Sequence, residues 1–237
     1  MAGTPTPAEH PADPAPAPAP TEPSGPTGPV WWEVGAVLAV GVFPHWASVL
    51  DTVFRDASRY TRYAASQFIV GACVSFATLY LMARSGRPWA AFGVVRPRLS
   101  DLAVGALLVP VVFAIGDVLP PLPDFGRPEG GYAPLPDGAA ELALMAVTML
   151  VAALAEELVT RAYLVTRLRE LLRSRAQAVV AAAALFASYH AYQGPRGLLF
   201  AFAFGVVYGL LFLLLGRVWP LVAGHALYNM ILDVGAG

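Results

Sequence analysis

The stretch LVAALAEELVTRAYLV, residues 150–165, places three ionisable side chains inside a run of apolar residues. Glu156, Glu157 and Arg161 have apolar neighbours for several helical turns on both sides. A charged side chain at the centre of a bilayer helix costs roughly 2.5–3.5 kcal/mol on insertion scales. A chain that carries three such groups so close together must therefore provide partners for them inside the fold.

The composition of the whole chain is that of an integral membrane protein. Its 237 residues are 57% hydrophobic and 13% charged, whereas soluble domains carry about 25% charged residues. The net charge of −1 offers no basic surface for nucleic acid, so no nucleic-acid partner is expected. The single cysteine, Cys73, excludes an intramolecular disulfide and every metal site built on a pair of cysteines.

The first 29 residues differ from the rest of the chain. Residues 1–29 alternate proline with small residues, which predicts an extended, disordered tail. This tail has neither a basic n-region nor an apolar h-region, so it is not expected to be a secretory signal. Residues 30–237 are expected to form one integral membrane domain.

Seven apolar segments follow the tail, and each is about 16–27 residues long, near the roughly 20 residues that span a bilayer. They cover approximately residues 31–50, 64–83, 99–119, 140–166, 177–193, 197–215 and 218–233. We therefore predict an all-α, polytopic bundle of about seven transmembrane helices. Gly205 and Gly209 form a small-xxx-small pair that either permits close helix packing or merely reflects the frequent glycine of membrane helices.

Arginine positions predict the orientation of the bundle, because cytoplasmic loops carry an excess of basic residues. One side carries nine arginines: Arg84, Arg87, Arg96, Arg98, Arg167, Arg169, Arg173, Arg175 and Arg217. The other side carries five: Arg55, Arg59, Arg62, Arg127 and Arg196. The first side is therefore expected to be cytoplasmic, with the N-terminus inside. The absence of lysine and the many alanines and prolines suggest a bacterium, hence its inner membrane.

The charged residues of the opening stretch differ in whether their own helix can neutralise them. Glu157 and Arg161 are four residues apart, so they share one helix face and can pair. Glu156 is turned about 100° away and needs a proton or a partner from another helix. For the Glu157–Arg161 pair alone, a purely structural ion pair is an equally good explanation.

Three polar residues in later segments could supply that partner: His190, His225 and Asn229. Counted from the basic side at 1.5 Å per residue, Glu156 lies about 16 Å deep, His190 about 20 Å, His225 about 12 Å and Asn229 about 18 Å. Their helices alternate in direction, yet all four groups fall in one layer of the membrane. Taken singly, each histidine or asparagine could be a structural hydrogen bond between helices. The agreement in depth instead predicts one shared, functional polar site.

These residues carry three short motifs: EELVTR at 156–161, FASYH at 186–190 and HALYN at 225–229. In this order, on consecutive apolar helices, they resemble the CPBP family of intramembrane proteases, which includes CAAX prenyl endopeptidases and bacteriocin-processing or Abi proteins. The resemblance covers about residues 140–233, and FGVVRPR at 92–98 is a weaker echo of a stretch before the family core. Family members often have an aromatic residue before the arginine and a glycine after it, where this chain has Thr160 and Ala162.

The resemblance implies an intramembrane endopeptidase and assigns roles to the motif residues. Glu156 would be the general base that activates water, and His190 would help to hold that water. His225 and Asn229 would donate hydrogen bonds to the developing oxyanion. Glu157 and Arg161 would support the site by orienting Glu156.

The resemblance leaves cofactor and substrate open. Zinc could be bound by Glu156, His190 and His225, but we favour a reaction without cofactor or metal, because Asn229 suits an oxyanion donor better than a zinc ligand. The substrate partner is expected to be a membrane-associated peptide or lipidated protein, either a CAAX-like C-terminus, a leader peptide or a C-terminal sorting segment.

Two other classes of protein use similar residues. A proton-coupled transporter places Glu, His and Arg in one membrane layer as a relay, although the first four segments hold no counterpart of the motifs, as an inverted repeat would require. A non-catalytic immunity or scaffold protein could keep the same buried polar network for structure alone.

Overall fold

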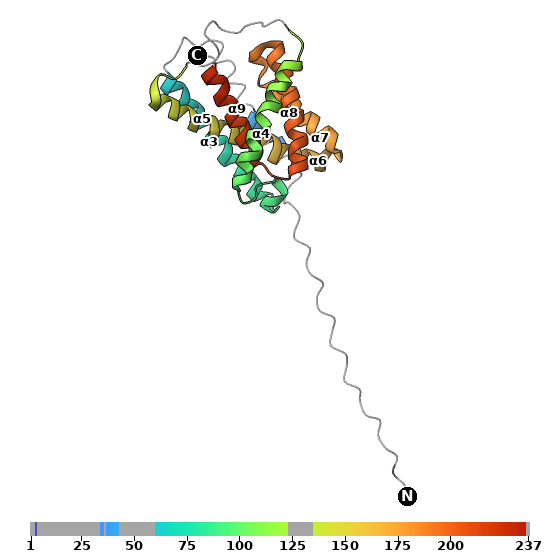
Figure 1. Cartoon of the computed structure of the whole chain (residues 1–237). Helices are drawn as coiled ribbons and strands as arrows, with labels where there is room; N and C mark the ends of the chain where they lie inside the picture. The colour runs from blue at the N-terminus through green and yellow to red at the C-terminus, as the bar shows by residue number, and fades with distance from the viewer. Residues whose placement is uncertain (1–2, 4–33, 36, 43–59, 123–134, 236–237) are drawn as a thin grey trace.

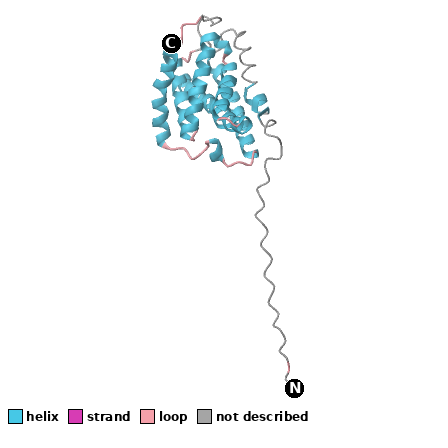
Figure 2. Ribbon diagram, turned by 90° about the vertical axis from the view of Figure 1, so that its right-hand side faces the viewer, coloured by secondary structure: helices cyan, strands magenta, loops and turns pink. Residues whose placement is uncertain are grey.

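The computed structural model describes residues 3, 34–35, 37–42, 60–122 and 135–235. Every regular element among these residues is a helix, as Figure 2 shows, which confirms the predicted all-α class. Nearly all of the tail at 1–29 and most of the first apolar segment, 31–50, lie outside the described residues. The predicted boundary between tail and membrane domain therefore stays a prediction.

From α5 to α9 the helices follow one another with short connections. In chain order they are η1 (Leu38–Val42), α3 (Tyr60–Arg84), η2 (Trp89–Phe92), α4 (Leu99–Val118), α5 (Gly138–Glu157), η3 (Leu158–Val165), α6 (Thr166–Leu172), α7 (Arg175–Ser188), η4 (Ala191–Gln193), α8 (Gly194–Leu215) and α9 (Trp219–Gly235). Of the short elements, η1 and η3 are π-helices, and η2 and η4 are 3-10 helices.

Each predicted apolar segment within the described residues coincides with a helix, but two boundaries were wrong. The segment predicted at 140–166 continues without interruption to Leu172, because α5, η3 and α6 join end to end. The segment predicted at 177–193 ends its α-helix at Ser188, so His190 lies in the turn after α7 rather than on the helix.

The described helices include three that are long and apolar enough to cross a membrane: Leu99–Val118, Gly138–Leu172 and Ala191–Leu215. Val70–Arg84 and Arg175–Ser188 are apolar but shorter. Within the described residues the predicted spans thus divide into full-length helices and shorter ones. The total of seven stays a prediction.

Large apolar side chains cover the outside of the bundle. Phe76 on α3 is 74% exposed, Leu107 on α4 is 71% exposed and Leu214 on α8 is 81% exposed. Soluble monomers rarely expose apolar surface on this scale, because it costs free energy in water. The outward faces therefore match the hydrocarbon of a bilayer, and the protein is a membrane helix bundle.

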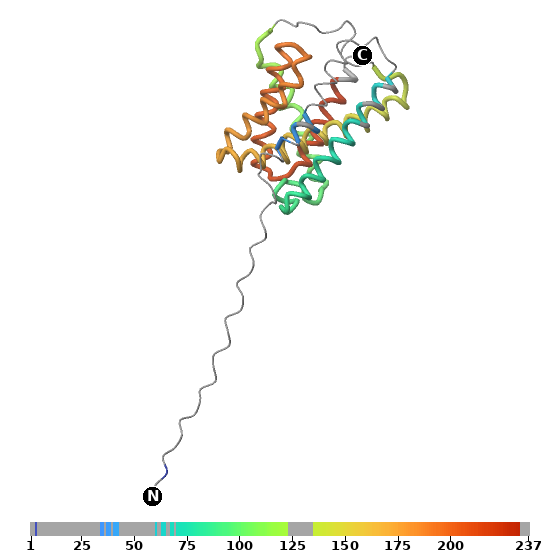
Figure 3. The backbone as a smooth tube through the Cα atoms, turned by 180° about the vertical axis from the view of Figure 1, so that it is seen from behind, coloured from blue at the N-terminus to red at the C-terminus, as the bar shows by residue number. Residues whose placement is uncertain are grey.

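The helix that carries the charged stretch lies inside this bundle. α5 packs against α3 and α9, and its continuation η3 contacts α3, α7 and α8. Figures 1 and 3 show α3 and α5 running side by side, and α4 lying along α9. Helices from both halves of the chain thus surround residues 150–165.

Glycines allow two of these helix pairs to approach closely. A Cβ atom added to Gly205 would lie 2.9 Å from Ala183 Cα, and one on Gly209 would lie 2.9 Å from Val179 Cγ1. α7 and α8 therefore pack closely at both glycines, which supports the packing interpretation of the small-xxx-small pair.

Gly105 and Gly224 bring α4 and α9 together backbone to backbone. A Cβ atom on Gly105 would lie 2.8 Å from Gly224 N, and a Cβ atom on Gly224 would lie 2.8 Å from the Gly105 carbonyl oxygen. Neither position has room for a side chain. The residue next to Gly224 is His225, so this contact fixes the part of α9 that enters the site.

Gly205→Ala is expected to destabilise the protein by about 1–3 kcal/mol, because the methyl group would press on the backbone of Ala183. Gly116→Ala is the matched control, since a Cβ atom there meets only Phe200 Cε2 at 3.8 Å. The control should be neutral or stabilising, because alanine favours the helix by about 1 kcal/mol. Thermal unfolding in detergent measures both, and equal unfolding midpoints would contradict the close packing.

The FGVVRPR segment joins the basic ends of the helices. Phe92 is buried with its ring stacked on Tyr163, at a centroid distance of 6.0 Å. Gly93 has φ of 68°, and the loop after it reaches Arg217, whose Nη2 donates to Asp101 Oδ2 at 2.6 Å. The hydrogen bonds with Asp101 raise the pKa of the Arg217 guanidinium. This segment thus ties α4 to the turn between α8 and α9.

Candidate active site

The charged stretch changes its helical geometry directly after its two glutamates. α5 ends at Glu157, and Leu158–Val165 continue as the π-helix η3. All eight residues of η3 are buried, including Thr160 and Arg161. π-helical turns inside α-helices are uncommon and occur frequently at functional sites.

The predicted pair between Glu157 and Arg161 is confirmed. Arg161 Nη1 donates to Glu157 Oε1 at 3.0 Å, and the two side chains are 1% and 0% exposed. The same Nη1 donates to Thr160 Oγ1 at 2.7 Å, while the Thr160 hydroxyl donates to the carbonyl of Glu156. Thr160, which departs from the family pattern, therefore connects the arginine to the backbone of the other glutamate.

His225 supplies the partner from another helix that Glu156 requires. Its Nε2 lies 3.5 Å from Glu156 Oε2, and its Nδ1 lies 2.8 Å from Glu157 Oε1. The buried imidazole of α9 thus stands between the two carboxylates of α5. A hydrogen on Nδ1 donates to Glu157, and the ring can also donate toward Glu156 when both nitrogens carry a hydrogen.

His190 joins this group through an aromatic ring. Its Nδ1 donates to the carbonyl of Phe186 at 2.9 Å, which leaves Nε2 as the acceptor of the neutral ring. The Phe186 ring lies 4.5 Å from the His190 ring and 6.4 Å from the His225 ring, between centroids. Phe186, the first residue of FASYH, therefore contacts both histidines.

Asn229 follows His225 by one turn of α9 and is half-buried. Among the described residues, no hydrogen bond involves its side chain. The structure thus brings Glu156, Glu157, Arg161 and His225 into direct contact, and it places Asn229 nearby by helix register alone. Its role as an oxyanion donor stays a prediction.

Aromatic rings enclose the arginine, and the motifs did not predict them. Arg161 Cζ lies 4.6 Å from the centroid of Phe186, 5.0 Å from that of Phe204 and 5.4 Å from that of Tyr208. Desolvated cation–π contacts contribute about 2 kcal/mol or more. The available sequence signal was the spacing of Phe204 and Tyr208, four apart and therefore on one face of α8.

Three buried polar atoms of this region form no hydrogen bond within the described part of the chain: Glu157 Oε2, Arg161 Nη2 and Tyr208 Oη. Buried polar groups in folded proteins are almost always satisfied by protein or by ordered water. These atoms therefore offer donors and acceptors to water or to a polar group of a substrate.

The zinc alternative, with Glu156, His190 and His225 as ligands, stays open. Among the described residues, no three His, Cys, Asp or Glu side chains are grouped as candidate metal ligands. Glu156 and His225 instead face each other directly. A reaction without metal stays a prediction, and metal analysis of the purified protein with activity after chelation tests it.

A helical membrane bundle in which a buried carboxylate, arginine and imidazole lie beside a second, partly buried carboxylate is an integral membrane protein with an intramembrane polar site. Residues 138–231 match the family described as type II CAAX prenyl endopeptidase Rce1-like. This match confirms the predicted resemblance to CPBP intramembrane proteases over that part of the chain. No curated protein and no solved structure matches the chain.

Thr160→Val is expected to destabilise the protein by about 1.5–3 kcal/mol, because the acceptor for Arg161 disappears from a buried site. Thr160→Ser keeps the hydroxyl and is the matched control, with a loss expected to be clearly smaller. Unfolding midpoints and peptidase rates of the two variants provide the comparison. Equal behaviour of Val and Ser would show that the hydroxyl does not hold Arg161 in place.

Proposed function

We propose that this protein is an intramembrane endopeptidase in which Glu156 activates a water molecule against a peptide bond. The observation that supports this proposal is the His225 imidazole, held by Glu157 through Nδ1 while Nε2 faces Glu156. A base and a hydrogen-bond donor thereby lie next to each other in a buried site. Such groups act strongly where water is largely excluded.

In the proposed reaction, Glu156 takes a proton from water as the water oxygen bonds to the carbonyl carbon of the substrate. The carbonyl oxygen becomes an oxyanion, which accepts hydrogen bonds from Asn229 and from Nε2–H of His225 with both ring nitrogens carrying a hydrogen. The carbon–nitrogen bond then breaks, and the proton passes from Glu156 to the leaving amine. His190, with Nε2 as its acceptor, holds the water, and the pair of Glu157 and Arg161 keeps His225 in position.

The substrate class in this proposal is a peptide with a lipidated C-terminal segment, of the CAAX type. The family description names prenyl endopeptidases, and a prenylated cysteine brings a peptide to the bilayer in which this site is buried. Leader peptides and C-terminal sorting segments of bacterial proteins remain the alternative substrates.

Proteoliposomes that contain the full chain test the function. We expect hydrolysis of a peptide ending in a prenylated cysteine and three further residues, detected by mass spectrometry, and no hydrolysis by His190→Ala. A pH-sensitive dye inside the same vesicles reports proton movement. Proton flux without hydrolysis would favour the proton-coupled transporter, and neither signal would favour a non-catalytic scaffold.

We also propose that the N-terminus and the loop between α6 and α7 are cytoplasmic, as the arginine bias suggests. Leu172 and Leu135 are both exposed and lie at opposite ends of α5–η3–α6. After replacement of the exposed Cys73 by serine, Leu172→Cys should resist a membrane-impermeant thiol reagent in intact cells, whereas Leu135→Cys should react. Labelling of Leu172→Cys from outside would reverse the proposed orientation.

A further inference from the structure

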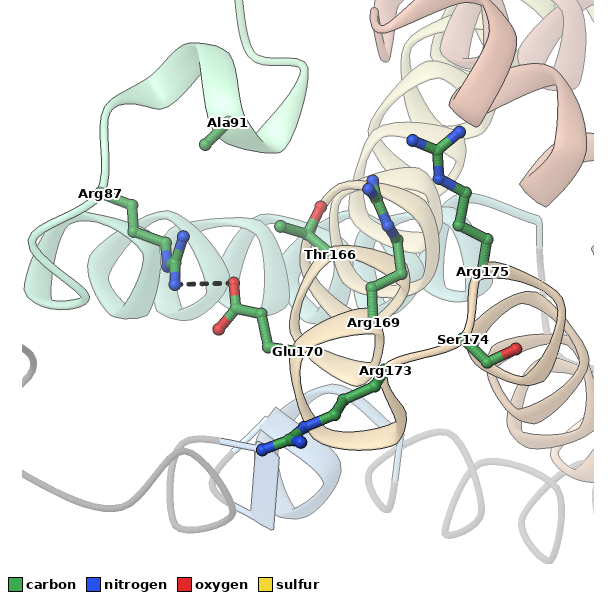
Figure 4. A pocket seen from close by; sticks show the side chains of 8 residues that line it. All are labelled: Arg87, Ala91, Thr166, Arg169, Glu170, Arg173, Ser174 and Arg175. Carbon is green, nitrogen blue, oxygen red and sulfur yellow. Dashed lines mark ion pairs between the residues drawn. The ribbon is translucent and has the colours of Figure 1, made fainter.

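A polar cavity lies at the basic end of the bundle, away from Glu156 and Glu157. It has a volume of about 410 Å³ and is formed where α6 turns into α7, opposite the connection after α3 (Figure 4). Seven polar side chains line its wall: Arg87, Thr166, Arg169, Glu170, Arg173, Ser174 and Arg175. None of the residues assigned to catalysis lines this cavity.

Glu170, the one acidic side chain among the described residues that line this cavity, is already paired. Glu170 Oε1 lies 2.9 Å from Arg87 Nη2, and Glu170 Oε2 accepts from Arg167 Nη1 at 2.7 Å. Arg167 itself is buried. The Glu170 carboxylate thus pairs with two guanidinium groups, so its single negative charge does not also neutralise the other arginines of the cavity.

Three other arginines of the wall have no carboxylate partner among the described residues. Within the part of the chain that the structure describes, no ion pair involves Arg169, Arg173 or Arg175. Three positive groups around one cavity repel one another, so an anion that binds there removes an unfavourable interaction. The cavity is therefore complementary to an anion.

The local backbone adds to this preference. Arg173 adopts a left-handed conformation with φ of 54°, which reverses the chain and lets α6 and α7 contribute to the same cavity. The Ser174 side chain caps α7 by accepting from Gln177 N at 3.3 Å. α7 therefore begins in the wall, and the positive end of its dipole favours an anion. Figure 4 shows Arg169 and Arg175 extending in the same direction from their helices.

We propose that this cavity binds a phosphate group. Guanidinium groups bind phosphate oxygens in a bidentate manner, and the Thr166 hydroxyl adds a further donor. The cavity lies at the end of the apolar helix Gly138–Leu172, where lipid headgroups begin. The phosphate can belong to an anionic phospholipid of that leaflet or to a soluble phosphate compound.

The test uses the full chain in phosphatidylcholine vesicles, with phosphatidylglycerol in one arm and inorganic phosphate in the other. Ligands that bind the folded state raise the unfolding midpoint. Arg173→Gln/Arg175→Gln removes two exposed arginines of the cavity, and Arg84→Gln/Arg96→Gln removes two exposed arginines elsewhere on the same basic side. Apparent affinity for the effective ligand should fall at least about tenfold in the cavity variant and little in the control.

Stabilisation by phosphatidylglycerol alone identifies a lipid phosphate as the ligand, and stabilisation by inorganic phosphate identifies a soluble one. No stabilisation in either arm, or equal losses in the cavity variant and the control, would overturn the proposal. Equal losses would mean that the arginines act only through the general surface charge.

Discussion

Glu156→Gln is expected to lower the rate of peptide hydrolysis about 10²–10⁴-fold while the protein stays folded, because the variant lacks the general base. The Glu156 side chain is 15% exposed and meets His225 only at 3.5 Å. Glutamine has the same shape, and its oxygen can still accept from the imidazole. The change should therefore appear in kcat, with an unfolding midpoint close to that of the parent protein.

Replacing the neighbouring glutamate should lower stability as well as activity. Glu157 is fully buried and accepts from Arg161 at 3.0 Å and His225 at 2.8 Å, so Glu157→Gln should have both effects. Asp117→Asn removes an exposed carboxylate outside the site and serves as the control. Residual activity of Glu156→Gln close to that of Asp117→Asn would refute the assignment of Glu156 as the base.

Arg161→Ala is expected to cost roughly 3–5 kcal/mol of folding free energy, the usual effect of removing one partner of a buried pair. The variant leaves Glu157 buried without its cation and opens a space between the rings of Phe186 and Phe204. Thermal or denaturant unfolding in detergent measures the loss, and purified yield should fall with it.

A double variant separates the cost of the unpaired Glu157 charge from the cost of the lost packing around Arg161. Adding Glu157→Gln to Arg161→Ala removes the stranded charge, so the double variant should be less destabilised than the sum of its single changes. Arg196→Ala is the control, since Arg196 is exposed and donates to the Gly116 carbonyl at 3.3 Å. It should change stability by no more than about 0.5 kcal/mol. Normal stability of Arg161→Ala would mean that Glu157 is protonated or hydrated.

Hydrophobic length and motif spacing were sufficient to predict the helices and much of the site. The depth comparison placed Glu156 and His225 in one layer, and their side chains are 3.5 Å apart. The four-residue spacing of Glu157 and Arg161 predicted their ion pair, because residues one turn apart share a helix face.

Features that depend on tertiary packing could not be predicted from the sequence. A π-helical turn at Leu158–Val165 leaves no signature in an apolar run. The second contact of His225, to Glu157, depends on how α9 crosses α5. The Phe204 and Tyr208 rings around Arg161 belong to α8, whose apolar residues are too uniform to indicate which face is inside.

Because Gly105 contacts Gly224, residues 138–231 do not contain every residue that positions their own polar site. The family match at 138–231 includes Gly224 but not Gly105, which lies on α4. The backbone next to His225 is thus positioned by a helix outside the matched region. A chimera that transplants residues 138–231 into another membrane scaffold would leave α9 without its counterpart, so α4 and the matched segment must be inherited together.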